Sequence, residues 1–394
     1  MKNIEAVKWC TGCFACVSVC PQNCISIAKD SLDTKIPIIN EDRCISCGKC
    51  LKICPQQSIV EKNYPISTYV GMSEDSGRKI SSASGGIANA LYKWAVKNDY
   101  YCVGAIWNKN KKRVELSIAS DESELEKFRN SKYVFSETNH IFERIKEIKK
   151  STPDKRILVI AMPCQIAALK SVFKKEYDNG LFLFVDIVCH GMANAIYLEK
   201  HIKTYIDIES VDNIAFREKG KFVFSVYGND RCLYKAKYDE DSYFLSYLES
   251  VIYRENCYHC QYANGERVGD LTIGDFDGID GESIKNDKLK NLRYPSMILV
   301  NTKIGEKLLQ DVESIIKEER LVTEAFRFNE QLKRPAQKSS YRNEFVKRYK
   351  KTHDFEKAIQ PYWNKKIIKK HIYNLKIYKL AHIMKVKIKN GREI

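Results

Sequence analysis

The sequence lacks long apolar runs: no stretch approaches the roughly 18 consecutive apolar residues that a membrane-spanning helix requires. Its first residues, MKNIEAVKWC, contain no apolar core of the kind found in secretory signals. We therefore expect a cytoplasmic protein, in which disulfide bonds are rare. The chain also has no helix-turn-helix, zinc-finger or aromatic RNA-binding signature, so we expect no nucleic-acid partner.

Excess positive charge is missing from most of the chain, although the net charge is +16. Residues 331–394 hold 19 Lys and Arg against four acidic residues, while the other 330 residues hold 47 basic and 46 acidic residues. The basic excess therefore belongs to a C-terminal tail. The sequence predicts a helix at 365–390, with an apolar stripe at Tyr373, Ile377, Leu380, Met384 and Ile388 opposite a lysine-rich face. Such a helix lies on an anionic inner membrane surface or packs its stripe on the protein.

Cysteine is abundant, with 15 residues, and its spacing is informative. Residues 10–21 read CTGCFACVSVCP and residues 44–55 read CISCGKCLKICP. Each is C-x2-C-x2-C-x3-C-P, the pattern of two-cluster bacterial ferredoxins, in which the fourth cysteine binds the other cluster. We predict two 4Fe–4S clusters, one held by Cys10, Cys13, Cys16 and Cys54 and the other by Cys44, Cys47, Cys50 and Cys20.

Zinc is the alternative occupant of these motifs, but zinc sites usually combine two C-x2-C pairs across a longer loop. We expect residues 1–62 to form an α+β ferredoxin-like domain, too small to be stable without metal. Cys24 lies outside both motifs and is interpreted as a buried structural thiol.

After residue 62, strand-like and helix-like segments alternate, which predicts an α/β domain over 63–330. We expect buried strands at 101–107, 156–161 and 181–188. We expect helices at 84–98, with Ser84 as its N-cap, at 165–175 and at 193–206.

Four features of this region suggest chemistry. SSASGG (81–86) is a small-residue loop before a helix, which suits a phosphate but equally a capped turn. MPCQ (162–165) and CHG (189–191) each follow a buried strand, where ligands bind in open α/β sheets. CYHC (257–260) is a C-x2-C pair, compatible with zinc, redox or cluster roles. Cys164, Cys189, Cys257 and Cys260 could be inert, or could converge on a third 4Fe–4S cluster.

These motifs, with SKYV (131–134) and GDLTIGDFDG (269–278), occur in an order that resembles the coenzyme F420 hydrogenase/dehydrogenase beta-subunit family. The resemblance spans roughly residues 1–300. It implies an FAD-binding α/β domain beside the ferredoxin domain, and it implies that Cys164, Cys189, Cys257 and Cys260 bind a third cluster. The cofactor contacts that we expect are Ser84, Gly85, Gly86, Ser131, Lys132, Gln165, His190 and Gly191.

The sequence departs from the family pattern near the expected substrate pocket. Ala161-Met162 replaces a frequent Gly-Thr, Asp277 replaces an aromatic residue, and Arg254-Glu255-Asn256 replaces a frequent Arg-Pro-Ser. The substrate is therefore open, and F420 itself is not assumed. Many bacterial members resemble parts of surface-polysaccharide pathways, which we expect here as well.

The resemblance implies an oxidoreductase in which a small molecule exchanges a hydride with FAD, and 4Fe–4S clusters pass electrons to a carrier such as ferredoxin. A non-catalytic electron-transfer or adaptor protein is the alternative, and a cluster-based sensor a third, although no output module accompanies it. His190 is either a proton or hydrogen-bond donor or an ordinary loop residue. Asp275 and Asp277 either face the pocket or form a turn, and no catalytic acid or base is assigned.

Overall fold

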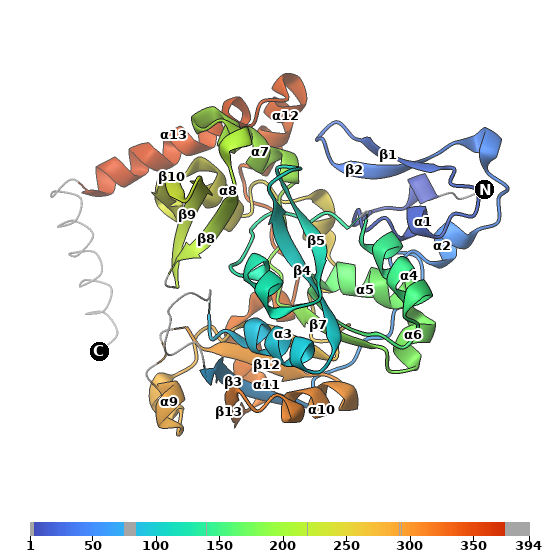
Figure 1. The fold of residues 1–394 in the computed structure, drawn as a ribbon. Coiled ribbons are helices and arrows are strands. Elements are labelled where there is room, and N and C mark those ends of the chain that lie inside the picture. The colour runs from blue at the N-terminus through green and yellow to red at the C-terminus, as the bar shows by residue number, and fades with distance from the viewer. Residues whose placement is uncertain are drawn as a thin grey trace.

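The computed structural model describes residues 4–74, 84–138, 140–218, 220–290, 292 and 294–374 (Figure 1). It is a mixed α/β structure with a small N-terminal unit, a large mixed sheet and a second small sheet covered by helices. The predicted helix at 365–390 falls largely outside the described residues, as do residues 81–83 of the small-residue loop. Among the helices that the structure describes, none is both long and apolar enough to cross a membrane.

The N-terminal unit consists of two short helices and a hairpin, α1 (Ala15–Ser18), β1 (Ile25–Lys29), β2 (Lys35–Ile39) and α2 (Lys49–Lys52). Both helices follow a residue in the left-handed conformation, Phe14 and Gly48. The core of this unit contains few aliphatic side chains, and cysteines make up much of the rest of it. Such a core stabilises a fold weakly without metal, which agrees with the ferredoxin pattern of the sequence.

The large sheet has eight strands in the order β13-β3-β12-β11-β7-β6-β4-β5. Its centre is parallel, because β4, β6, β7 and β11 run in one direction, while the outer strands are antiparallel. The three predicted strands are present as β4, β6 and β7. The bounds are β3 (Ser67–Ser73), β4 (Tyr100–Asn108), β5 (Arg113–Ala119), β6 (Arg156–Ala161), β7 (Phe182–Ile187), β11 (Leu271–Asp275), β12 (Ser296–Val300) and β13 (Ile315–Arg320).

Helices cover both faces of this sheet, because alternate residues of each central strand point to opposite sides. On β6, Leu158 and Ile160 pack in the cluster that contains α3 (Ile87–Lys97) and α10 (Lys303–Asp311). Ile157 and Val159 pack on the other face, in the cluster that contains α4 (Ile141–Ser151) and α5 (Pro163–Val172). The remaining short helices are α6 (Lys174–Asp178), α9 (Asp287–Lys290) and α11 (Val322–Phe328).

The prediction that Ser84 caps the helix after the small-residue loop is wrong. The helix begins at Ile87, and its N-cap is Gly86, which has a φ of 79° that glycine adopts without strain. The Ser84 hydroxyl lies 3.0 Å from the Ser296 hydroxyl on β12 instead. The loop is therefore held against the sheet.

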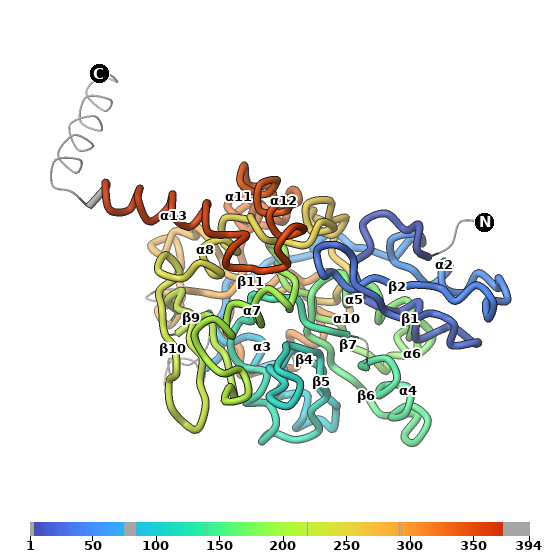
Figure 2. Tube along the Cα trace, turned by 90° about the horizontal axis from the view of Figure 1, so that it is seen from above, coloured from blue at the N-terminus to red at the C-terminus, as the bar shows by residue number. Residues whose placement is uncertain are grey.

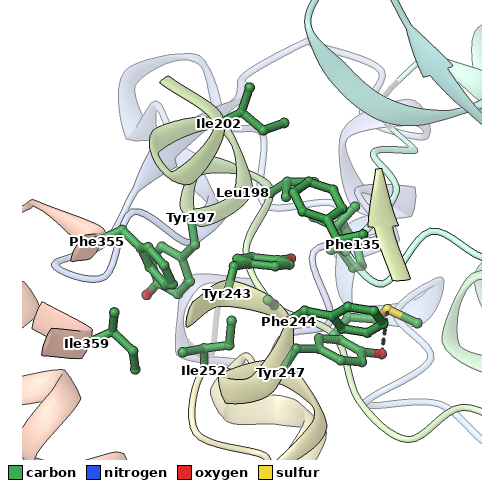
Figure 3. Packing of buried hydrophobic residues seen from close by; sticks show 14 of the residues in the cluster. Phe135, Tyr197, Leu198, Ile202, Tyr243, Phe244, Tyr247, Ile252, Phe355 and Ile359 are labelled. Carbon is green, nitrogen blue, oxygen red and sulfur yellow. Dashed lines mark hydrogen bonds between the residues drawn. The ribbon is translucent and has the colours of Figure 1, made fainter. Parts of the chain in front are cut away.

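A second sheet, of β8 (Asn213–Glu218), β9 (Lys221–Gly228) and β10 (Arg231–Lys237), packs against helices from distant parts of the chain. These helices are α7 (Ala195–Tyr205), α8 (Ser242–Leu248), α12 (Arg342–Thr352) and α13 (Phe355–Asn374). Figure 2 shows α13 running along α8, and Figure 3 shows Phe355 and Ile359 of α13 packed near Tyr197 of α7. The described part of the basic tail therefore belongs to a buried core.

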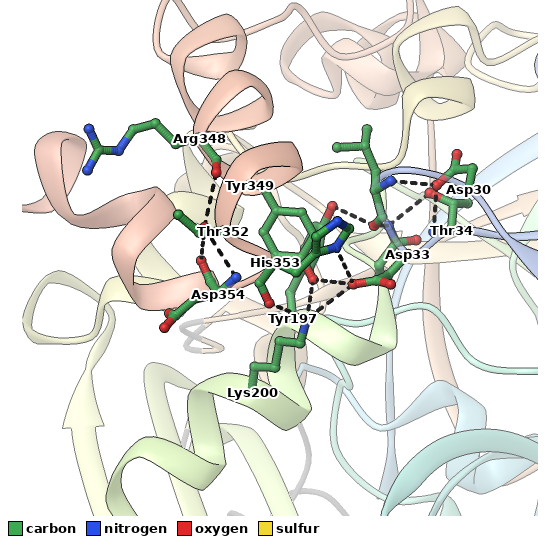
Figure 4. A network of polar contacts seen from close by, with 12 residues as sticks. Asp30, Asp33, Thr34, Tyr197, Lys200, Arg348, Tyr349, Thr352, His353 and Asp354 are labelled. Carbon is green, nitrogen blue, oxygen red and sulfur yellow. Dashed lines mark hydrogen bonds and ion pairs between the residues drawn. The ribbon is translucent and has the colours of Figure 1, made fainter.

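The N-terminal unit is fastened to α7 and α12 by the turn of its hairpin (Figure 4). The Asp33 carboxylate accepts hydrogen bonds from the Tyr349 hydroxyl at 2.7 Å and the Lys200 ammonium at 3.1 Å. The Tyr197 hydroxyl donates to the Leu32 carbonyl at 3.0 Å, and the Asn194 amide donates to the Thr34 hydroxyl at 3.0 Å. These contacts fix how the two cysteine motifs face the large sheet.

A buried ion pair ties β7 to the segment before β11. Asp186 and Arg267 are 0% and 2% exposed, and their side chains meet at 2.7 Å. The same carboxylate accepts hydrogen bonds from the backbone N–H groups of Val268 and Gly269. Arg267 also donates to the Ile187 and Tyr262 carbonyls, so it links the CHG turn to the CYHC segment.

A second buried network joins α13 to the rest of the molecule. The His201 imidazole lies 2.6 Å from the Glu356 carboxylate and 2.8 Å from the Asp241 carboxylate. Burial lowers the pKa of His201, but the two carboxylates outweigh burial and raise it to about 9. Tyr234 donates to Asp241 at 2.9 Å and Tyr205 packs against the ring. His201 is therefore a protonated bridge between two acids at neutral pH.

The His201 bridge predicts a loss of stability in alkaline solution. Because the folded pKa lies above the ordinary value of 6.5, the stabilisation is complete below pH 6.5 and disappears as the pH rises through about 9. The slope from this group is at most about 1.4 kcal/mol per pH unit. Anaerobic urea unfolding from pH 6 to 9.5 measures it. His201→Gln should flatten the profile, whereas His371→Gln, in an exposed position, should not; equal slopes in all three proteins would refute the bridge.

The Asp186–Arg267 pair predicts a large effect of Asp186→Asn. This change leaves the Arg267 charge buried without a counter-charge, which typically costs about 3–5 kcal/mol. Urea unfolding of wild type and variant gives the difference. Asp178→Asn removes a carboxylate from the exposed pair with Lys174 and should have a much smaller effect. Similar losses in the two variants would contradict the assigned role.

Candidate metal centres and adjoining redox pocket

The structure brings together the thiols predicted to hold the first cluster. Burial raises the pKa of Cys16, and the charges of Cys13, Cys10 and Cys54 raise it further. These four thiols come from both motifs, as the exchange of the fourth cysteine requires. The Gly12 N–H lies 3.4 Å from the Cys10 sulfur. Such hydrogen bonds to sulfur are the ones that tune iron–sulfur clusters.

The thiols predicted for the second cluster lie at a more exposed place. Burial raises the pKa of Cys50, with further contributions from Cys44 and Cys47, and Cys47 itself is exposed. Cys24, interpreted above as structural, is buried as expected, but its sulfur lies 3.4 Å from that of Cys20. It also interacts with Cys44. The second thiol group therefore has a fifth cysteine beside it.

The four remaining predicted ligands converge on one pocket. Cys164 lies in the first turn of α5, directly after β6, and Cys189 follows β7. Cys257 lies in the short 3-10 helix Glu255–His259, and Cys260 follows it. All four line the same pocket, together with His190 and Arg254. Burial raises the pKa of Cys164, as do the charges of Cys260, Cys189 and Cys257 in that order.

These surroundings suit a 4Fe–4S cluster. Four neighbouring thiols oppose one another's ionisation, whereas bound iron deprotonates its cysteine ligands. The Met192 N–H lies 3.4 Å from the Cys257 sulfur and can donate to it. In the described part of the chain, no three His, Cys, Asp or Glu side chains are arranged to hold a single metal ion. That finding concerns single ions, and a cubane meets each cysteine at a different corner.

The first and third thiol groups are neighbours across the contact between the N-terminal unit and the sheet. Tyr262 lies between them, because Cys164 and Cys13 both act on its hydroxyl, whose pKa burial raises most. The Arg254 guanidinium donates to the Thr11 carbonyl at 2.7 Å and lines the third pocket. The Thr138 hydroxyl donates to the Cys13 carbonyl at 2.7 Å.

A polar group adjoins the third pocket at the same sheet edge. Asp275 ends β11, and its carboxylate pairs with the Arg217 guanidinium at 2.5 Å. Arg217 is 4% exposed, interacts with the Tyr133 hydroxyl and has no partner for its buried Nε among the described residues. Desolvation lowers the pKa of His190, an effect that Asp275 partly offsets. Burial raises the pKa of Asp277, and Asp275 adds to the increase.

The two motifs that the resemblance assigns to FAD both reach this polar group. Ser296, the strand partner of Asp275, lies beside Ser84 and Gly85. A Cβ on Gly85 would lie 2.6 Å from the Gly71 carbonyl, so only glycine fits there. From the SKYV motif, Tyr133 contributes its hydroxyl.

Other predicted cofactor contacts have protein partners. Lys132 donates to three backbone carbonyls, the nearest that of Arg129 at 2.6 Å, and burial lowers its pKa to about 7. Ser131 interacts with Tyr133. Gln165 caps the start of α5 and donates to Ser136. Gly191 has a φ of 125° and packs against the Tyr253 ring, where a Cβ would clash. The described contacts of these residues position the pocket walls.

Sequence reasoning missed several residues of these sites, among them Arg254, Tyr262, Arg217 and Tyr133 as a side chain. Arg254 is three positions before Cys257, and Tyr262 is two positions after Cys260. Proximity to the C-x2-C pair was the available signal. Burial of their side chains is a property of the folded chain only.

Comparison with known proteins agrees with this arrangement. Residues 9–58 match the family model of the 4Fe-4S dicluster domain, and residues 154–325 match that of the C terminus of the coenzyme F420 hydrogenase/dehydrogenase beta subunit. No curated protein matches the chain. Among solved structures, a chain of the F420-reducing [NiFe] hydrogenase complex from Methanosarcina barkeri is 18% identical, with a TM-score of 0.44 over 66% of this chain and 85% of that one.

The N-terminal unit is thus a two-cluster iron–sulfur domain, and the sheet that carries the third thiol group corresponds to the matched C-terminal domain. The predicted resemblance is confirmed: the chain belongs to the coenzyme F420 hydrogenase/dehydrogenase beta-subunit family.

Proposed function

We propose that this protein is an iron–sulfur flavoprotein oxidoreductase. It binds FAD and three 4Fe–4S clusters, exchanges a hydride with a small molecule, and passes electrons to a carrier such as ferredoxin. The observation that carries the proposal is the pocket lined by Cys164, Cys189, Cys257 and Cys260. These thiols come from three separate segments, and their pocket adjoins a polar group fit for a cofactor or substrate.

The convergence of two motifs around Asp275 supports a flavin beside the third thiol group. Ser84 and Gly85 approach from α3, and Tyr133 approaches through Arg217. Arg217 would hold an anionic or carbonyl group of the bound molecule, since its Nε has no described partner. Bound FAD would supply the conversion between hydride and single-electron transfer.

His190 joins the two parts of the site. It follows Cys189 directly and responds to the charge of Asp275. Because its pKa is lowered below 6.5, the imidazole is neutral at pH 7 and is able to accept a proton from a substrate. The substrate is either a deazaflavin such as F420 or another small molecule. The link to surface-polysaccharide synthesis rests on the resemblance alone.

The placement of the thiol groups supports an order of electron transfer. The third group is next to the polar pocket, Tyr262 separates it from the first group, and the second group includes the exposed Cys47. We infer that electrons pass between the pocket and the third, first and second clusters in turn. A redox carrier would then dock near Cys47.

The decisive measurement is iron, sulfide and flavin content of anaerobically purified full-length protein. Four irons per cluster predict about 12 irons and one FAD. Cys257→Ala/Cys260→Ala should retain about eight irons, and Cys102→Ala/Cys232→Ala, which removes two thiols outside the pocket, should retain about 12. About eight irons and no flavin in wild type after reconstitution would favour the non-catalytic electron-transfer or adaptor alternative.

The placement of the flavin predicts that Arg217→Met weakens FAD binding about tenfold or more, since charge-assisted hydrogen bonds contribute about 1.5–3 kcal/mol. Iron content should stay at the wild-type level, because Arg217 is not in the thiol groups. Fluorescence titration of FAD measures the affinity. Arg231→Met on the exposed strand β10 is the control. Unchanged affinity in Arg217→Met would place the flavin elsewhere.

A further inference from the structure

Arg254 is a buried cation at the junction of the first and third thiol groups. Its side chain is 3% exposed, and in the described part of the chain it forms no ion pair with a carboxylate. Its guanidinium donates to the Thr11 carbonyl and lies over the Phe135 ring at 3.9 Å. An unpaired buried charge is strongly unfavourable, and a carbonyl and a ring compensate it only in part.

The contacts of Arg254 connect it to both groups of cysteines. A Cβ on Gly12, between Cys10 and Cys13, would lie 2.5 Å from the guanidinium, so the cluster loop presses closely on it. The Arg254 carbonyl accepts a hydrogen bond from the Cys257 N–H at 3.0 Å, and its own N–H donates to Met192 at 2.8 Å. Arg254 is thus positioned by the segment that carries the third group and points to the first.

Other cations near the third pocket have a counter-charge or access to solvent. Arg267 pairs with Asp186 at 2.7 Å, and Arg342 pairs with Glu255 at 3.7 Å. Lys62 is partly exposed and donates to the Gln261 carbonyl. A 4Fe–4S cluster with four thiolate ligands carries a net negative charge, which increases on reduction. It is the anion that this site is missing.

We propose that Arg254 is the buried counter-ion of the third 4Fe–4S cluster, shared with the loop of the first, and that its charge raises the reduction potential of the third cluster. Arg254 is therefore a positioning residue that acts through the clusters. This inference rests on the proposed function, because it requires the third cluster. Its consequence is that the third cluster holds an electron more firmly than its own ligands alone would allow, which favours electron flow from the pocket toward it.

The test is a potentiometric titration, followed by electron paramagnetic resonance, of the full-length protein. Cys257→Ala/Cys260→Ala identifies the signal that belongs to the third cluster. In Arg254→Met that signal should titrate at a more negative potential than in wild type, because the reduced cluster loses its cation. The second cluster, ligated by Cys44, Cys47, Cys50 and Cys20, should titrate as in wild type and serves as the internal reference. Arg254→Lys should restore much of the shift.

Lys62→Met is the matched control, since it removes one charge near Cys260 from a solvent-accessible position. Its shift should be smaller because solvent screens the lost charge. Equal potentials of the third cluster in wild type and Arg254→Met would overturn the proposal, as would equal shifts in Arg254→Met and Lys62→Met. If Arg254→Met retains only eight irons, Arg254→Lys decides: 12 irons supports the counter-ion role, and eight irons refutes it by showing that charge alone is not what the site needs.

The iron content of wild type separates this inference from the proposed function. About eight irons in wild type would mean that the third cluster itself is absent, so the proposed function fails first. About 12 irons with no effect of Arg254 on the potential would leave the function standing and reject only the role of Arg254.

Discussion

The parallel course of β6, β7 and β11 is the constraint on which the rest of the site depends. Parallel neighbours end at the same edge of a sheet, so the residues that follow them meet there. Cys164, Cys189 and Asp275 occupy these strand ends. The buried Asp186–Arg267 pair then brings the CYHC segment to the same edge. A shift in any of these strands would separate the thiols from the polar group.

The second constraint is the fixed contact between the two-cluster domain and this edge. The hairpin turn at Asp33 and the loop at Thr11 contact parts of the chain that are more than 150 residues away. Tyr262 and Arg254 occupy the gap between the first and third thiol groups. Electron transfer needs short, stable separations between centres, and buried contacts on both sides of the junction supply them. The described part of the tail serves the same purpose, since Tyr349 of α12 binds Asp33.

Much of this could be predicted because local sequence carried the relevant physics. The twin cysteine motifs define their chemistry by spacing, and the strands at 156–161 and 181–188 are apolar on both faces because helices cover both sides. The N-cap of α3 was predicted wrongly because a serine is a common cap, whereas Ser84 is bonded to Ser296 on a strand more than 200 residues away. The packing of α12 and α13 was not predicted, because high lysine content obscured Phe345, Tyr349 and Phe355.

The sequence by itself determined the two-cluster domain, the family and the alternation of strands and helices, because these depend on spacing and periodicity within short segments. Only the tertiary structure decided which cysteines meet at the third pocket, and that Arg254 is buried between two thiol groups without a carboxylate partner in the described chain. The physical reason is that burial and charge compensation depend on every segment packed around a side chain. Those segments are distant in sequence and are brought together only by the fold.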